Sequence, residues 1–133
     1  MKDTPSPRPL SAKLGVKPGF ALTILGGPPG FADLLSPLPD DVTLQARAAA
    51  GADLYVCFVR SVRELDARLA TLAPLIGSRT LWFAWPKKAS GTTTDLDGNI
   101  VRTRGLDAGL VDYKVCAIDA TWSGLAFKRR NRF

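Results

Sequence analysis

Hydrophobic residues occur in this chain as short runs, separated by turns that are rich in glycine and proline. Six of these runs have the length of β-strands, and they lie at 20–25, 42–45, 54–59, 80–85, 110–118 and 125–129. The run at 54–59 is apolar at every position. That pattern is typical of a central strand in a parallel sheet, where helices cover both faces.

One helix is specified clearly, between the strands predicted at 54–59 and 80–85. Ser61 and Glu64 form a capping box, in which each side chain satisfies a free amide of the first helical turn. Apolar residues then recur at helical spacing, at Leu65, Leu69, Leu72 and Ile76. Pro74 and Gly77 end the helix. The helix and its two flanking strands therefore form a βαβ unit, which is right-handed in nearly all proteins.

Weaker signals predict the remaining elements. A short helix at 10–14 ends at Gly15, and a helical turn is expected at 31–35. A further helix is expected from about 94 to 104, with Gly105 at its end. The short connection between the last two strands, 119–124, indicates an antiparallel hairpin.

These elements predict one α/β domain with a three-layer, Rossmann-like architecture, a mostly parallel sheet and a C-terminal antiparallel hairpin. A chain of 133 residues is too short for two ordinary domains. We place the domain at 10–129, after a polar, proline-rich leader at 1–9 that is expected to be flexible. The residues 130–133 form a basic tail.

The composition of the chain gives a net positive charge and indicates a cytoplasmic location. The chain has 18 lysines and arginines against 12 acidic residues, for a net charge of +6, which favours weak attraction to anions. Cys57 and Cys116 each lie within an apolar run, as expected for buried, reduced thiols in a cytoplasmic protein. No signal peptide is evident, and the apolar runs are much shorter than the ~20 residues that cross a membrane. We therefore expect a cytoplasmic protein that does not associate with membranes.

Three loops follow the carboxyl ends of predicted parallel strands, which is where α/β folds bind ligands. They are the glycine-rich loop at 26–30, the segment at 60–61 and the loop at 86–94. The basic and hydroxyl side chains that they offer are those of Arg60, Lys87, Lys88 and Ser90. If the loops converge, this edge suits an anionic group. The alternative is that these side chains are simply solvated at the surface.

The glycine-rich loop is a weak nucleotide signal. Only Gly27 and Gly30 lie in the register of a dinucleotide fingerprint, because position 25 is leucine. Pro28 and Pro29 also lack the amide hydrogens that would bind a phosphate. A tight turn between a strand and a helix accounts for the same residues.

Several catalytic schemes lack their residues. The sequence contains no histidine, so histidine-based acid–base catalysis is excluded, and we expect no metal site. Asp119 lies at a predicted strand end and is interpreted mainly as the cap of a turn. Trp122 is placed in the hairpin turn, where it is expected to be partly exposed. There it either stacks on a ring or base, or packs over the sheet edge.

The order of helix, Lys17-Pro18-Gly19, strand and glycine-rich loop resembles the start of Rossmann-like methyltransferases. The closing antiparallel hairpin fits the same resemblance. It implies S-adenosylmethionine as the cofactor. Those enzymes carry an acid and three alternating glycines after the first strand, whereas this chain has Leu-Gly-Gly-Pro-Pro-Gly at 25–30. On the sequence alone, S-adenosylmethionine is therefore the less favoured ligand.

A second resemblance covers nearly the whole chain. The segments 10–15 (LSAKLG), 85–91 (WPKKASG) and 115–125 (VCAIDATWSGL) are similar to a bacterial family known only as domain of unknown function 3052. This resemblance implies a small cytoplasmic bacterial protein, and it implies no activity. It draws attention to the loop at 87–91 and the turn at 119–124.

Three functions stay open at this point. The leading hypothesis is a non-catalytic binding or regulatory module that contacts an anionic small molecule or a protein partner. The alternative is a small-molecule methyltransferase that uses S-adenosylmethionine through a degenerate glycine loop. A further alternative is association with nucleic acid through the basic residues Lys128, Arg129, Arg130 and Arg132. The residues expected at the ligand site are Gly27, Gly30, Arg60, Lys87, Lys88, Ser90, Asp119 and Trp122, with no catalytic residue among them.

Overall fold

The computed structural model describes residues 9–130, so most of the predicted leader and residues 131–133 of the basic tail lie outside it. Its six strands are β1 (Ala21–Leu25), β2 (Thr43–Gln45), β3 (Leu54–Phe58), β4 (Thr80–Pro86), β5 (Leu110–Ala117) and β6 (Trp122–Arg129). Its helices are α1 (Leu10–Leu14), α2 (Phe31–Leu34), α3 (Val62–Leu72), α4 (Gly98–Asp107) and the short 3₁₀ helix η1 (Lys88–Ser90).

The six strands form one sheet in the order β2-β1-β3-β4-β6-β5. Strands β2, β1, β3 and β4 are parallel, while β6 pairs antiparallel with both β4 and β5. From β1 the chain adds β2 on one side, and it then crosses to add β3 on the other. The carboxyl ends of β1 and β3 are therefore a topological switch point, the place where open α/β sheets bind ligands.

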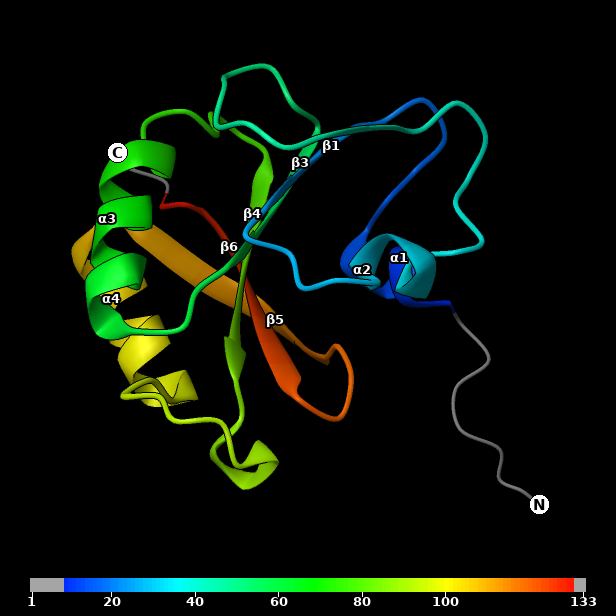
Figure 1. Cartoon of the computed structure of the whole chain (residues 1–133). Helices are drawn as coiled ribbons and strands as arrows, with labels where there is room; N and C mark the ends of the chain where they lie inside the picture. Colours follow the sequence, from blue (N-terminus) through cyan, green and yellow to red (C-terminus); the bar gives the residue numbers. More distant parts are fainter. Residues whose placement is uncertain (1–8, 131–133) are drawn as a thin grey trace.

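Helices cover both faces of the sheet, as Figure 1 shows, with α1 and α2 on one side and α3 and α4 on the other. Each face carries its own buried core, and the fully apolar β3 contributes side chains to both. On the α1 face, the indole nitrogen of Trp82 donates a hydrogen bond of 2.8 Å to the Leu14 carbonyl oxygen, which fixes the end of α1 to β4. The predicted three-layer α/β fold is thus confirmed.

Helix α3 begins as the sequence predicts, with one difference in its cap. The Ser61 hydroxyl accepts a hydrogen bond from the Glu64 amide at 3.1 Å, which is the first half of a capping box. The Glu64 carboxylate, however, accepts from the amide of Arg60 at 2.7 Å, one residue before the cap. Glu64 therefore also fixes the backbone of the loop that follows β3.

Helix α4 corrects the predicted range of 94–104. It starts at Gly98, because the Asp97 carboxylate caps it by accepting from the Ile100 amide at 2.8 Å. It also runs past Gly105, which lies inside the helix and not at its end. A β-carbon at Gly105 would overlap the Phe127 ring, so glycine is needed there for helix α4 to approach β6.

Both cysteines are buried and free, as expected. Burial raises the pKa of the Cys57 thiol to about 12, and burial also raises the pKa of the Cys116 thiol. Within residues 9–130, no helix combines the length and the apolar character that a membrane crossing requires.

Candidate functional site

The predicted ligand loops do meet at the carboxyl edge of the sheet, and they bind each other there. An Nη2 group of Arg60 donates to the Gly26 carbonyl oxygen at 3.1 Å, which joins the loop after β3 to the loop after β1. The Arg60 guanidinium also lies 5.0 Å from the centre of the Trp122 ring. Lys87 Nζ donates to the Asp119 carbonyl oxygen at 2.9 Å. We call Arg60, Lys87, Asp119 and Trp122 the closed half of this edge.

Trp122 does not lie in the hairpin turn, where the sequence places it. It is the first residue of β6, and it pairs with Pro86 of β4. Its side chain is 7% exposed, and its ring meets the Phe58 ring edge-on at 5.0 Å. The expectation of a partly exposed ring is wrong, because the strand extends further than the pattern indicated. Of the two roles expected for Trp122, the structure therefore supports packing within the protein.

The other polar residues predicted at this edge are also used by the fold. The Asp119 carboxylate accepts the amides of Thr121 and Trp122, each at 2.8 Å, so the predicted turn cap is confirmed. The Ser90 hydroxyl donates to the Lys87 carbonyl oxygen at 2.6 Å. The Lys88 side chain, in η1, is exposed and has no hydrogen bond or ion pair with a described residue. Ligand binding by these residues stays a prediction.

The glycine-rich loop is shaped by contacts within the protein. Gly26 has a φ of 67°, and a β-carbon there would lie 2.9 Å from the Phe58 carbonyl oxygen. At Gly27 a β-carbon would lie 3.0 Å from a methyl group of Ile24. Gly30 has a φ of 84° and precedes α2. The interpretation as a tight turn between a strand and a helix therefore accounts for the loop.

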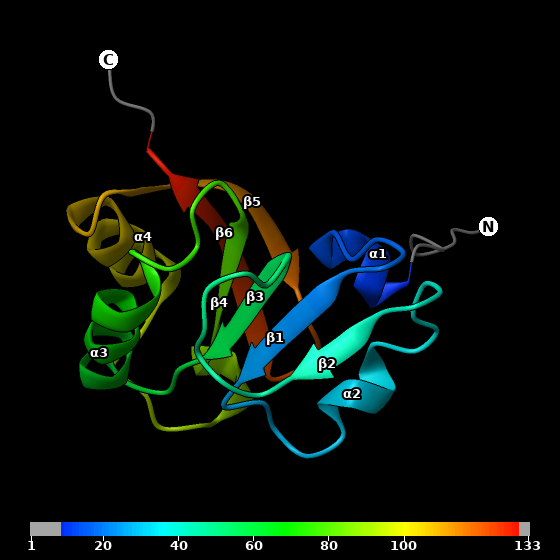
Figure 2. The same cartoon turned by 90° about the horizontal axis from the view of Figure 1, so that it is seen from above.

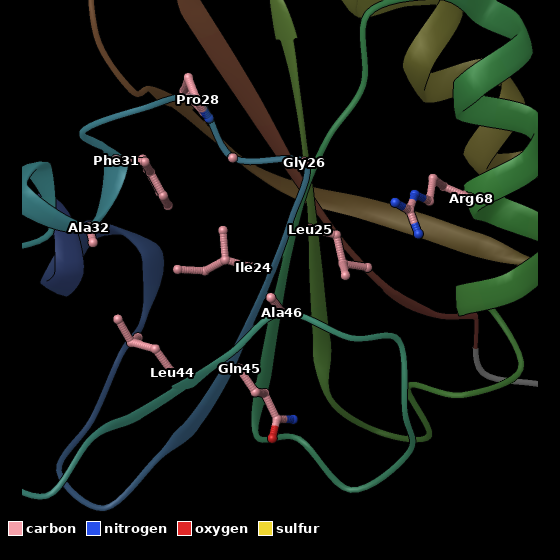
Figure 3. A pocket seen from close by; sticks show the side chains of 11 residues that line it. Ile24, Leu25, Gly26, Pro28, Phe31, Ala32, Leu44, Gln45, Ala46 and Arg68 are labelled. Atoms are coloured by element: carbon pink, nitrogen blue, oxygen red, sulfur yellow. The ribbon is translucent and has the colours of Figure 1, made fainter.

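Next to the closed half, the ends of β1 and β2 border a groove of about 450 Å³ that we call the open half. Figure 3 shows the residues of its walls, which come from β1, β2, α2, α3 and the segments that follow β1 and β2. They are Ile24, Leu25, Gly26, Gly27, Pro28, Phe31, Ala32, Leu44, Gln45, Ala46 and Arg68. Of the residues predicted at the site, Gly27 lines this groove and Gly30 does not. The volume lies within the usual range of small-molecule pockets.

Two polar side chains of the open half were missed by the sequence analysis. Gln45 ends β2, and its Nε2 donates to the Thr23 hydroxyl at 2.9 Å, which leaves its carbonyl oxygen as a free acceptor. The Arg68 guanidinium has no hydrogen bond or ion pair with a described residue, and it extends towards Leu25 (Figure 3). A signal for Arg68 was present, since it lies three residues after Leu65 and four before Leu72, on the apolar stripe of the helix.

Comparison with solved structures identifies the fold. Magnesium protoporphyrin IX methyltransferase from Synechocystis PCC 6803, with bound S-adenosylmethionine (SAM), superposes with a TM-score of 0.61 at 13% identity, over 91% of this chain and 74% of that one. The ribosomal protein L11 methylase of Lactobacillus delbrueckii subsp. bulgaricus gives 0.56 at 13% identity, over 92% and 76%. A methyltransferase-like Rossmann fold is thereby shown. A putative methyltransferase from Thermoplasma acidophilum also superposes on the chain, with a TM-score of 0.56 at 9% identity, over 87% and 70%.

These neighbours correct the leading functional hypothesis. A non-catalytic binding or regulatory module is contradicted, because the neighbours are methyltransferases and favour the alternative that the sequence left second. No protein-family model matches the chain, and no curated protein matches it either. The methyltransferase-like resemblance therefore rests on the fold, and the more specific resemblance to domain of unknown function 3052 is not shown.

Proposed function

We propose that this protein is a small-molecule methyltransferase that binds S-adenosylmethionine in the open half of the carboxyl edge. The observation that carries the proposal is the groove itself. It lies beside the switch point of a methyltransferase-like sheet, and two of its polar side chains, Gln45 and Arg68, have groups that the fold does not use. Polar groups that converge in an otherwise apolar pocket are the usual mark of a ligand site.

The residues present suit this cofactor in three respects. The apolar side chains of Ile24, Phe31 and Leu44 offer a surface for the adenine ring. The free carbonyl oxygen of Gln45 can accept a hydrogen bond from a ribose hydroxyl, in place of the acid that the sequence lacks at this strand end. The Arg68 guanidinium suits the carboxylate of the methionine moiety. Pro28, in the glycine-rich loop that borders the groove, has no amide hydrogen. Side chains must therefore supply more of the hydrogen bonds to the cofactor.

When bound, S-adenosylmethionine would supply an electrophilic methyl group to a nucleophilic atom of an acceptor molecule, with S-adenosylhomocysteine as the leaving group. The chain offers little to remove a proton from that acceptor. It has no histidine, and at this edge the Asp119 carboxylate accepts two amides while the Asp95 carboxylate accepts the Val62 amide at 2.8 Å. We therefore expect an acceptor whose nucleophile is already deprotonated near neutral pH, such as a thiolate, an acidic phenolate or a carboxylate.

Two further expectations remain proposals. They are the family resemblance to domain of unknown function 3052 and the cytoplasmic location. Nucleic-acid binding through the tail is less favoured, because two of its arginines serve the fold. Arg129 donates to the Ala73 carbonyl oxygen at 3.0 Å, and Arg130 donates to that of Leu106 at 2.7 Å. A lysine or arginine held in this way is less available to a phosphate backbone.

Calorimetric titration with S-adenosylmethionine tests the proposal. We expect saturable binding to the unmodified protein, and a loss of at least about tenfold in affinity for Arg68→Gln, since a charge-assisted hydrogen bond is removed. The control is Arg63→Gln on the same helix, which removes the same charge from an exposed arginine outside the groove. That control should bind within about twofold of the unmodified protein, as surface changes do.

Absence of binding at millimolar S-adenosylmethionine would overturn the proposal, provided that the protein shows a normal cooperative unfolding transition. Equal weakening in Arg63→Gln and Arg68→Gln would show that net charge matters and that the groove does not.

A further inference from the structure

A second hollow lies at the opposite end of the sheet, beside the amino-terminal ends of the parallel strands. In Figure 2 this edge lies away from the arrowheads of β1, β2 and β3. The hollow measures about 260 Å³, and five separate stretches of chain border it. Its lining consists of Leu14, Gly15, Lys17, Phe20, Asp53, Leu54, Ser78, Arg79, Thr80, Tyr113, Lys114 and Lys128. We call it the basic pocket.

The charge of the basic pocket is strongly positive and mostly unpaired. Lys17, Arg79, Lys114 and Lys128 supply four positive charges, against the single acid Asp53. Asp53 is already used twice, by the guanidinium of Arg79 at 3.3 Å and by the amide of Ala21 at 2.8 Å. Among the described residues, no hydrogen-bond or ion-pair partner contacts the side-chain ammonium group of Lys17 or of Lys114. Like charges brought together without partners repel each other, so the fold itself does not explain the arrangement.

Hydroxyl groups complete the lining. The Tyr113 and Thr80 hydroxyls share a hydrogen bond of 2.6 Å, in which either oxygen can be the donor. One of the two hydroxyl hydrogens is used in that bond, and the other stays available to a ligand. The ammonium group of Lys128 lies over the Tyr113 ring, 5.2 Å from its centre, in a cation–π contact.

We propose that the basic pocket binds a small anion carrying two or more phosphate groups. Lysine ammonium groups and a free hydroxyl are suitable donors for phosphate oxygens. The size of the hollow favours a compact ligand, since 260 Å³ is below the usual range for drug-sized molecules. This site is separate from the open half, because the two lie at opposite ends of the strands. The proposal therefore stands independently of the methyltransferase function.

Calorimetric titration with inorganic pyrophosphate tests this proposal on the full chain. We expect saturable binding to the unmodified protein and at least about tenfold weaker binding by Lys17→Gln combined with Lys114→Gln, because two charge-assisted contacts are lost. The two ammonium groups have no hydrogen-bond or ion-pair partner among the described residues and repel their cationic neighbours, so the double variant should unfold at the same temperature as the unmodified protein or a higher one. The matched control combines Arg47→Gln with Arg63→Gln, two exposed arginines outside the pocket.

The control removes the same net charge and should bind pyrophosphate within about twofold of the unmodified protein. Tyr113→Phe, which keeps the ring and removes the hydroxyl, should weaken binding by a few fold. Absence of saturable binding at millimolar pyrophosphate would overturn the proposal. Equal loss of pyrophosphate affinity in both double variants would also overturn the proposal. So would a protein that does not bind pyrophosphate but binds a short DNA duplex tightly through Lys17 and Lys114.

Discussion

The two halves of the carboxyl edge both carry positively charged side chains, and they differ in how the structure uses them. The closed half takes its basic side chains from loops that follow strands, whereas the open half takes Arg68 from helix α3. In the closed half, Arg60 and Lys87 donate to carbonyl oxygens of neighbouring loops. In the open half, the Arg68 guanidinium and the side-chain carbonyl oxygen of Gln45 have no such partner among residues 9–130, and both residues line a groove of about 450 Å³.

This difference separates residues that build the edge from residues that can serve a ligand. A basic residue looks the same in the sequence whether its side chain holds a neighbouring loop in place or binds a ligand. The fold decides between them through hydrogen bonds, since a guanidinium that already holds a carbonyl oxygen offers less to an anion. We therefore expect substitutions in the closed half to lower stability, and substitutions in the open half to lower ligand affinity.

The largest effect on stability should come from Trp122→Ala in the closed half. The ring is 7% exposed and packs against Phe58, so its removal leaves a cavity and should lower the free energy of unfolding by about 3–5 kcal/mol. Leu44→Ala in the open half should cost less than about 1 kcal/mol, because Leu44 is 43% exposed. Urea unfolding of both variants measures the contrast. Similar losses for the two would remove the distinction between the halves.

A smaller contrast is expected between the two arginines. Arg60→Gln removes a hydrogen bond to Gly26 and a ring contact with Trp122, both near the surface, and should lower stability by about 0.5–1 kcal/mol. Its affinity for S-adenosylmethionine should change little. Arg68→Gln should show the reverse, with stability within about 0.5 kcal/mol and weakened cofactor binding. Thermal unfolding with and without the cofactor distinguishes the two; a cofactor effect confined to Arg60→Gln would place the ligand in the closed half.

The sequence predicted the elements well where one local signal dominates. The apolar run of β3 and the cap at Ser61 are short-range features, and both were located correctly. Helix α4 was misplaced because the Asp97 cap before Gly98 was not identified and because Gly105 was interpreted as the helix end, whereas Gly105 makes room for Phe127. That second contact joins residues far apart in sequence, so no local pattern contains it.

The site was predicted in part for the same reason. The rule that ligands bind at the carboxyl ends of strands located the correct edge, and the loops do converge there. Which side chains stay free depends on hydrogen-bond partners from other segments, such as the Asp119 carbonyl oxygen that binds Lys87. Arg68 was missed because it projects from a helix and not from one of the loops.

The smallest expected effect concerns Cys57, which lies in β3 close to the open half. Burial raises the pKa of its thiol to about 12 from an ordinary value of 9.0, and the nearby charge of Arg68 partly opposes that shift. The folded protein thus keeps the thiol proton at pH values where the unfolded chain has released it. This contribution to stability is complete below pH 9 and is lost as the pH rises from 9 to about 12.

Cys57→Ala isolates that term, because the tyrosines and lysines that titrate in the same range are common to both proteins. Between pH 9 and 11, the free energy of unfolding should fall more steeply with pH for the unmodified protein than for the variant. The difference between the two slopes should correspond to the release of up to about one more proton per molecule on unfolding. Parallel curves would mean that the thiol is less buried than the structure places it. A steeper fall for the unmodified protein would instead confirm that the Cys57 thiol lies in a dry, apolar strand, where the nearby charge of Arg68 opposes the shift only in part.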